Sequence, residues 1–234
     1  MGTVYAIANQ KGGVGKTTSA VNLASCTAAE GEQTLLVDLD PQCNATVALG
    51  GDRDLHPSSY DCLTGDTEVA AAARPAGPDN LWLVPANVDL AGAAVELPRI
   101  ENSEIRLRER LGPVSVNALV AADRVIVPVQ AEYLALEGLV QFLDTLGMIR
   151  RQLNPRLEVS GLLITMYDER LRLAQDVEAE VREHFPGMVF ETVIPRSVRV
   201  AESPSYGLPV TEHAPSSRGA VAYKALAKEL AARG

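Results

Sequence analysis

A glycine-rich turn near the amino terminus constrains the fold of this chain more than any other feature. It reads Lys11-Gly12-Gly13-Val14-Gly15-Lys16-Thr17-Thr18, and it lies between an apolar run at residues 4–8 and an alanine-rich segment at residues 16–30. The run is typical of a buried parallel strand, and the segment is typical of a helix. Glycines let the backbone N–H groups of such a turn point inward, and the helix N-terminus adds its own N–H groups. The sequence therefore predicts a phosphate-binding turn at a strand–helix junction.

Two side chains in this turn suit nucleotide chemistry. Lys16 can reach the β- and γ-phosphates of a nucleotide, and Thr17 can hold Mg²⁺. We expect all eight residues from Lys11 to Thr18 to line the nucleotide site. The turn is a variant, because Gln10 stands where the common pattern has its first glycine and an extra lysine follows it.

Strand-like and helix-like segments alternate along the rest of the chain. The expected strands are residues 34–37, 81–84, 124–129, 158–165 and 189–194; the expected helices are residues 88–111, 115–122, 134–153, 170–184 and 217–233, with short helical pieces at 60–63 and 69–73. This alternation predicts an α/β fold with a doubly wound, mainly parallel sheet and helices on both faces. Because the 234 residues contain no repeat and no obvious linker, we expect one domain over residues 1–234.

Composition narrows the classes of function. The net charge of −9 excludes a general basic field for nucleic acid, so any DNA contact would need a local basic patch. Cys26, Cys43 and Cys62 have no CxxC spacing, which favours a reduced, cytoplasmic protein with buried thiols. No run of about 18 apolar residues occurs, so we expect no stable membrane anchor.

Several other segments, together with the two-lysine turn, resemble the ParA/Soj partitioning ATPases of the ParA/MinD group. One of them begins Asp38-Leu39-Asp40-Pro41 after the second expected strand. The others are residues 116–120, 125–130, 132–139, 193–199, 203–209 and 217–220. The similarity covers nearly the whole chain. It implies a nucleoid-associated ATP hydrolase that uses Mg²⁺ and forms a homodimer around ATP.

The resemblance also assigns roles to residues of the phosphate site. It implies that Lys16 grips the phosphates and that Lys11 reaches across the dimer to the phosphates bound by the partner. Thr17 and Asp38 would lie at the Mg²⁺ ion. Asp40 would orient or deprotonate the attacking water, and such positioning is most of what phosphoryl transfer requires.

The carboxyl-terminal segments carry the adenine and DNA assignments. By resemblance, Pro195 and Ser197 would lie at the adenine, with Ser197 replacing an asparagine of the family. Arg196, Arg199 and Arg218 would bind DNA without sequence preference. The ordinary alternative for each arginine is a solvated surface or an ion pair with a nearby acid. The resemblance further implies a ParB-like, centromere-binding partner that stimulates hydrolysis.

The chain departs from the family between Leu111 and Gly112. The family has one more strand there, placed beside the first strand in the middle of the sheet and ending in an Asp-x-Pro-Pro motif whose acid helps to hold Mg²⁺. Losing a central strand would leave buried backbone groups unpaired, at about 1–3 kcal/mol for each group. Either the natural protein contains residues that this sequence lacks, or the segment is deleted.

Four functions therefore compete. A DNA-partitioning ATPase accounts for most of the residues, while a nucleotide-binding scaffold without hydrolysis accounts for the lacking acid. A membrane-positioning ATPase of the MinD kind requires a basic amphipathic helix at the carboxyl terminus, but residues 220–233 have the alanine-rich pattern of a packing helix. A metabolic or iron–sulfur relative is disfavoured because the cysteines lack the spacing of cluster ligands.

Overall fold

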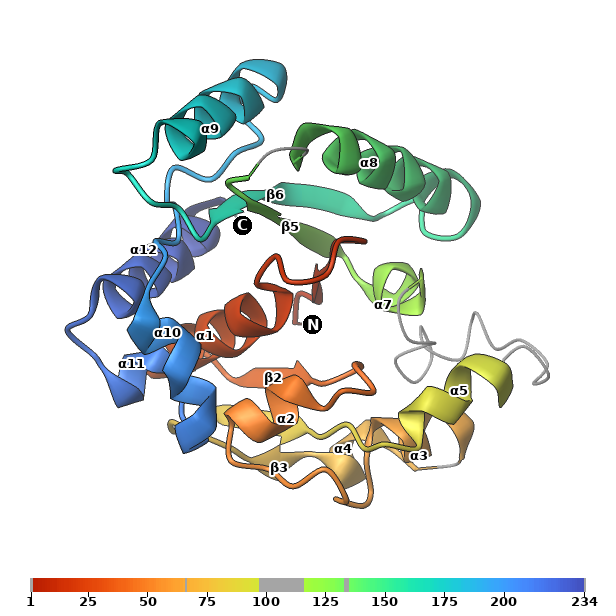
Figure 1. Ribbon diagram of the computed structural model, residues 1–234. Coiled ribbons are helices and arrows are strands. Elements are labelled where there is room, and N and C mark those ends of the chain that lie inside the picture. Colours follow the sequence, from red (N-terminus) through yellow and green to blue (C-terminus); the bar gives the residue numbers. More distant parts are fainter. Residues whose placement is uncertain (1, 66, 97–115, 133–134, 234) are drawn as a thin grey trace.

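The computed structural model describes residues 2–65, 67–96, 116–132 and 135–233, which form two three-stranded sheets (Figure 1). The first sheet contains β1 (Tyr5–Ile7), β5 (Arg124–Gln130) and β6 (Glu158–Thr165) in the order β1-β5-β6, with both pairs parallel. The second contains β2 (Thr34–Val37), β4 (Leu81–Val84) and β3 (Arg74–Pro75) in the order β2-β4-β3. Only β3 is antiparallel to its neighbour among these strands. The expected mainly parallel α/β architecture is confirmed.

Helices cover both faces of the first sheet (Figure 1). One face packs against α7 (Val116–Ala121), α8 (Ala135–Gln152) and α9 (Arg172–His184). The other packs against α1 (Lys16–Ala29) and α12 (Arg218–Arg233). The shorter elements are α2 (Asn44–Ala48), α3 (Ser59–Thr64), α4 (Val69–Ala72), α5 (Leu90–Glu96), α10 (Val198–Glu202), η2 (Ser203–Tyr206) and α11 (Val210–His213). None of the helices in these ranges is long and apolar enough to cross a membrane.

Helix α1 joins the two sheets. Its Leu23 belongs to an apolar cluster with Ile126 of β5, whereas its Val21 belongs to a separate cluster with Leu81 of β4. Side chains at neighbouring positions of a helix point to different sides, so one helix can serve both layers. The glycine-rich turn precedes α1, and its position is therefore fixed by both sheets.

The described strands form two sheets instead of the expected single sheet, and β1 and β2 each lie at the edge of one of them. Within the described ranges, β1 pairs only with β5 and β2 pairs only with β4. Each therefore has one neighbour where a doubly wound sheet would give it two. A strand between β1 and β2 would give each of them its second neighbour, and its lack stays an expectation. The Leu111–Gly112 junction, like the second half of the helix expected at residues 88–111, lies outside the described residues.

The strand expected at residues 189–194 is wrong. This segment touches β6 through isolated bridges, one of them between Leu162 and Val189, and forms no continuous strand. The reason is a competing partner: the carboxylate of Glu229 on α12 accepts the backbone N–H groups of Glu191 and Thr192 at 2.8 and 2.9 Å. These two groups are therefore not available to a β ladder.

Candidate functional site

The turn between β1 and α1 has the backbone geometry of an anion site. Gly13 and Gly15 have φ angles of 75° and 85°, a region that favours glycine. Gly15 caps α1 without any side-chain hydrogen bond, and the first turn of the helix carries no acidic residue. The free N–H groups and the positive end of the helix dipole therefore face a position that a phosphate can fill.

Residues at the ends of three strands hold this turn. Asn9, just after β1, donates to the carbonyl of Pro128 at 2.7 Å and accepts the backbone N–H of Lys11 at 3.0 Å. Thr165, the last residue of β6, donates its hydroxyl to the carbonyl of Val14 at 2.9 Å. Sequence reasoning did not select Asn9 or Thr165. Their only sequence signal is a polar residue at the carboxyl end of an apolar strand.

The two lysines of the turn are arranged differently. The Nζ of Lys16 donates to the backbone carbonyl of Lys11 at 2.9 Å, so the ammonium group lies against the turn itself. A phosphate bound in the turn would replace this carbonyl as the partner of the ammonium group. The side chain of Lys11 is exposed, as a role toward a second chain would require.

The two acids after β2 lie close together, and Asp38 contacts α2. Oδ1 of Asp38 accepts the backbone N–H of Asp40 at 3.1 Å, and Oδ2 accepts the N–H and hydroxyl of Thr46 at 2.8 and 2.7 Å. Burial raises the pKa of Asp38, while the hydrogen bonds from Thr46 oppose that shift. Asp40 accepts the backbone N–H of Gln42 at 2.9 Å. Within the described residues, neither carboxylate hydrogen-bonds to the glycine-rich turn.

The side chains present show whether Mg²⁺ could be bound at this site. No group of three or more His, Cys, Asp or Glu side chains suited to a metal occurs in the described ranges. Mg²⁺ commonly uses one or two carboxylates together with substrate phosphates and water, so such a cluster is not needed. A carboxylate has about four acceptor sites, and Asp38 uses three of them. By the chemistry of their oxygen ligands, Asp38 and the partly exposed Thr17 suit an ion whose other ligands come from a nucleotide.

Thr46 connects Asp38 to the second sheet and gives a first prediction. Its buried hydroxyl donates to Asp38 and accepts the backbone N–H of Ala86 at 2.9 Å. Thr46→Val keeps the shape but leaves that N–H unpaired and weakens the support of a buried carboxylate. We expect a loss of about 2–4 kcal/mol in the free energy of unfolding, measured by urea denaturation.

Thr27→Val is the matched control for this substitution. The hydroxyl of Thr27 donates only to the carbonyl of Leu23 in its own helix at 2.9 Å. We expect a change below about 1 kcal/mol there, because no buried group loses its only partner. Equal losses in the two variants would show that the hydrogen bonds joining Asp38, Thr46 and Ala86 contribute no more stability than the single bond of Thr27.

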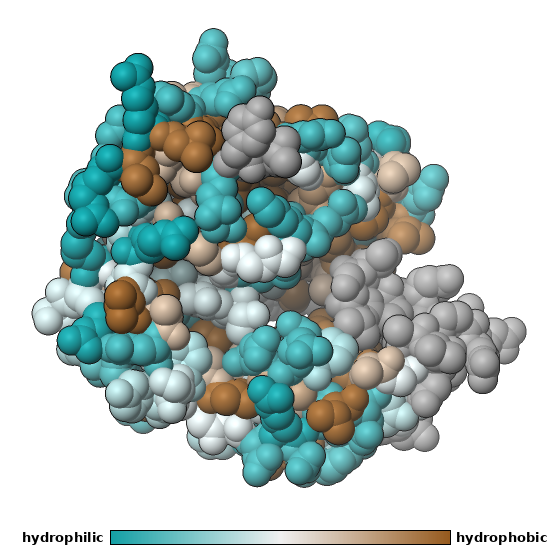
Figure 2. Space-filling view, viewed as in Figure 1, coloured by the Kyte–Doolittle hydropathy of each residue, from teal (hydrophilic) through white to brown (hydrophobic). Residues whose placement is uncertain are grey.

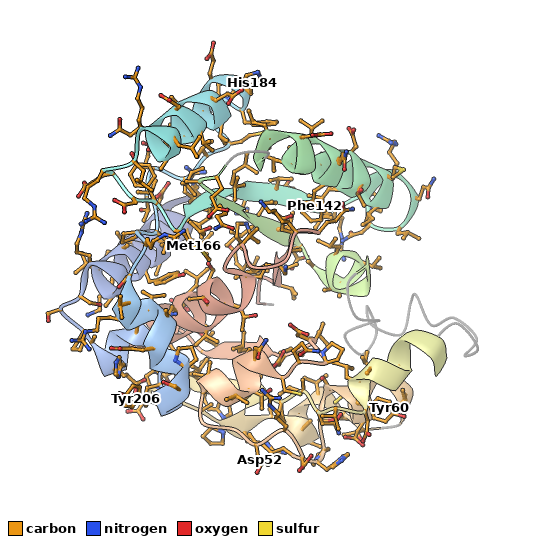
Figure 3. All side chains as sticks on the ribbon, viewed as in Figure 1. Asp52, Tyr60, Phe142, Met166, His184 and Tyr206 are labelled. Carbon is orange, nitrogen blue, oxygen red and sulfur yellow. The ribbon has the colours of Figure 1, made fainter. Side chains whose placement is uncertain are left out.

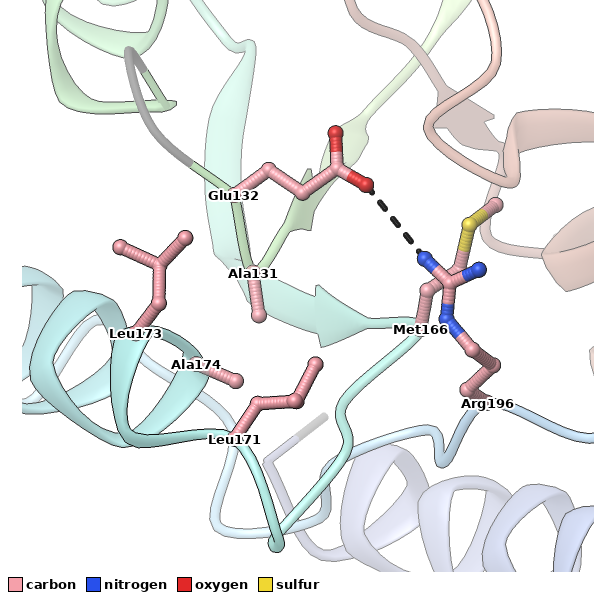
Figure 4. Close-up of a pocket in the computed structure, with 7 residues that line it drawn as sticks. All are labelled: Ala131, Glu132, Met166, Leu171, Leu173, Ala174 and Arg196. Carbon is pink, nitrogen blue, oxygen red and sulfur yellow. Dashed lines mark hydrogen bonds and ion pairs between the residues drawn. The ribbon is translucent and has the colours of Figure 1, made fainter.

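Pro195 and Ser197 follow the irregular segment beside β6. The side chain of Ser197 accepts the N–H of Val200 at 3.5 Å and so caps α10. Between them, Arg196 borders a cavity of about 360 Å³ at the carboxyl ends of β5 and β6 (Figure 4). The cavity is lined by Ala131, Glu132, Met166, Leu171, Leu173, Ala174 and Arg196. Figure 3 places Met166 near the centre of the molecule, one residue beyond the Thr165 that holds the turn.

All three arginines selected for DNA are paired with acids. Arg196 lies 3.4 Å from Glu132, Arg199 lies 2.6 Å from Glu202, and Arg218 lies 3.0 Å from Glu169. Sequence reasoning missed a fourth arginine in this region. Arg170 donates to both oxygens of Asp168, at 2.9 and 2.7 Å, and lowers the pKa of that carboxyl to about 2.

Comparisons with known proteins agree with this geometry. The profile of the CobQ/CobB/MinD/ParA nucleotide binding domain matches residues 5–210. The chain is 44% identical to the sporulation initiation inhibitor protein Soj of Bacillus subtilis, over 100% of both chains. It is 50% identical to the chromosome-partitioning ATPase Soj of Thermus thermophilus, over 97% of this chain and 95% of that protein. The chain belongs to the ParA/Soj family.

A similar solved structure relates the fold to a bound nucleotide. The cobyrinic acid a,c-diamide synthase of Mycobacterium smegmatis, with bound ATP analog and magnesium, is 36% identical and has a TM-score of 0.82. The similarity covers 97% of the ParA/Soj chain described here and 93% of the synthase. Nucleotide and Mg²⁺ binding are thus properties of the family.

The relatives are longer within the matched region. The alignment with the Bacillus subtilis protein spans 253 positions and includes all 234 residues of this chain. Therefore, at least 19 positions of that relative, the difference between these lengths, have no counterpart here. This is enough for a strand with its connections.

Proposed function

We propose that the chain is an ATP-dependent DNA-partitioning ATPase. Its ATP-bound homodimer binds DNA without sequence preference, and a ParB-like partner stimulates hydrolysis and release. The observation that carries the proposal is the two-lysine turn, which presents the free N-terminus of α1 in a chain 44% identical over its full length to Soj. Association with the nucleoid in the cytoplasm follows from this function.

Each residue of the site has its own role in the proposed reaction. The N–H groups of residues 12–17 and the ammonium group of Lys16 bind the phosphates and neutralise their charge. Thr17 and Asp38 hold Mg²⁺, which supplies further charge neutralisation when it is bound. Asp40 orients the attacking water, and Lys11 of a second chain completes the charge around the transferred phosphoryl group.

The adenine is proposed to lie at Pro195 and Ser197. The backbone N–H of Arg196, between them, donates to the carbonyl of Tyr167 at 2.9 Å, which fixes this segment against the end of β6. The hydroxyl of Ser197 caps α10 through a long contact of 3.5 Å, so it can also meet the edge of a base.

A nucleotide-binding scaffold without hydrolysis is the second candidate. The specific observation in its favour is the divided sheet, together with at least 19 positions of the Bacillus subtilis relative that have no counterpart here. In this case, the chain would dimerise and hold DNA without turnover. A membrane-positioning role receives less support, because α12 buries Tyr223, Leu226 and Leu230 in the core.

The test of the proposal is ATP-dependent dimerisation, measured by light scattering after size-exclusion chromatography. We expect the wild-type mass to double with ATP and Mg²⁺. Lys11→Ala should bind ATP but remain monomeric, because two bound nucleotides then face each other without the bridging cation. Lys224→Ala, an exposed lysine on α12, is the matched control and should dimerise. A Lys11→Ala dimer as stable as the wild type would refute the role of Lys11.

A further inference from the structure

Four arginines from three separate segments meet on one surface. The segments are the loop between β6 and α9, residues 195–199, and the start of α12. The backbone N–H of Arg196 donates to the carbonyl of Tyr167 in that loop. Gly219 of α12 lies so close to Ser197 that an added Cβ would be 3.6 Å from the Cβ of Ser197. Arg170, Arg196, Arg199 and Arg218 therefore share a surface, which we call the arginine surface.

Around α9, hydrophilic side chains and a hydrophobic patch both reach the surface (Figure 2). The arginine surface is nevertheless locally neutral, since each of its four cations is paired with a carboxylate. The acids are Asp168, Glu132, Glu202 and Glu169, in the order of the arginines given above. A phosphate approaching any of these arginines meets a carboxylate of like charge within 3.4 Å of the guanidinium group.

The four ion pairs differ in how readily a phosphate can replace the carboxylate at the arginine. Arg218 and Glu169 are the most open, with 74% and 60% of their side chains exposed. Arg196 and Glu132 are also exposed and their contact is the longest of the four, while Glu132 accepts a second hydrogen bond from the neighbouring Gln130 at 2.6 Å. In contrast, Glu202 is held by His213 at 3.0 Å in addition to Arg199, and Asp168 is only 14% exposed. Exposed pairs contribute little to stability, so an incoming phosphate can displace their carboxylates at small cost.

We propose that Glu169 and Glu132 are intramolecular competitors of DNA phosphate on the arginine surface. In the free chain they neutralise Arg218 and Arg196. When a DNA phosphate has replaced them at the arginines, the displaced carboxylates repel it. They therefore weaken DNA binding and limit it to low salt. This inference rests on the proposed DNA-binding function. It adds that the acidic partners, and not only the arginines, set the affinity.

The competition predicts tighter DNA binding when a competing charge is removed without changing shape. Glu169→Gln is the cleanest substitution, because the only side chain that hydrogen-bonds to its carboxylate in the described ranges is Arg218. With ATP and Mg²⁺ present, we expect its affinity for a random-sequence duplex to rise roughly three- to tenfold in fluorescence anisotropy. The slope of log affinity against log salt should steepen by up to about one, as one more phosphate is neutralised.

Two further variants separate local competition from bulk charge. Glu183→Gln removes an equal charge at an exposed position of α9 where no described cation pairs with the side chain, and it should leave the affinity nearly unchanged. Arg218→Gln added to Glu169→Gln should cancel the gain, because the freed arginine is then absent.

The outcomes test the inference separately from the proposed function. A gain in Glu169→Gln that exceeds the gain in Glu183→Gln and disappears with Arg218→Gln supports the competition. Equal gains in Glu169→Gln and Glu183→Gln, or no gain in either while the wild type binds DNA, overturn the competition alone. Absence of DNA binding in the wild type and in all variants overturns both the competition and the DNA-binding function.

Discussion

Lys16→Ala is expected to lower the affinity for ATP by roughly 100-fold, equivalent to about 2.7 kcal/mol. The ammonium group of Lys16 lies against the turn through the carbonyl of Lys11, within reach of any anion bound at the start of α1. Removing a charged hydrogen-bond donor from a phosphate costs about 1.5–3 kcal/mol. Calorimetric titration of the variant with ATP and Mg²⁺ measures the effect directly.

The substitution should not disturb the fold. Lys16 is the first residue of α1, where alanine is a good helix former, and its side chain is only partly buried. The urea midpoint of the variant should therefore stay close to that of the wild type. Lys228→Ala, at an exposed position of α12, is the matched control and should bind ATP normally. Unchanged ATP affinity in a folded Lys16→Ala protein would refute the assignment of the turn.

Most of the fold could be predicted because its strands are contiguous apolar runs with clear ends. β2, β4 and β6 occur with the expected bounds. β3 has only two residues, and α2, α10 and α11 have four or five, which is too short for any periodicity to show. The strand expected at residues 189–194 fails for a different reason. The Glu229 carboxylate that takes its N–H groups lies 37 and 38 positions away along the chain.

The candidate site, like the fold, could be predicted from the sequence only in part. The eight residues of the turn are contiguous and carry their own signal, so sequence alone selected them. The partners of the arginines could not be selected from sequence. Glu132 and Arg196 are 64 positions apart, and Glu169 and Arg218 are 49 apart. Only the packing of α12 and the loop after β6 brings these charges together, and the DNA-binding role of the arginines stays a prediction.

Inserting the surplus residues of the Bacillus subtilis relative between Leu111 and Gly112 should raise both stability and ATP turnover. In the described ranges, β1 and β2 each have one neighbour, so a parallel strand between them would pair with both edges. Each added backbone hydrogen bond contributes about 1 kcal/mol, and several of them would contribute about 3–5 kcal/mol. For a chain of this size, that gain raises the melting temperature by roughly 10 °C.

An equally long Gly/Ser-rich insertion is the matched control, because it lengthens the chain without favouring a strand. The resemblance implies that the relative's segment also brings the acid at the end of the strand. Turnover should therefore rise with this segment alone and disappear again when Asp40→Ala is added. An equal rise in melting temperature with both insertions would mean that chain length, not a strand, was lacking. A rise in stability without turnover would favour the scaffold, because the site would then be complete in structure but unable to position the attacking water.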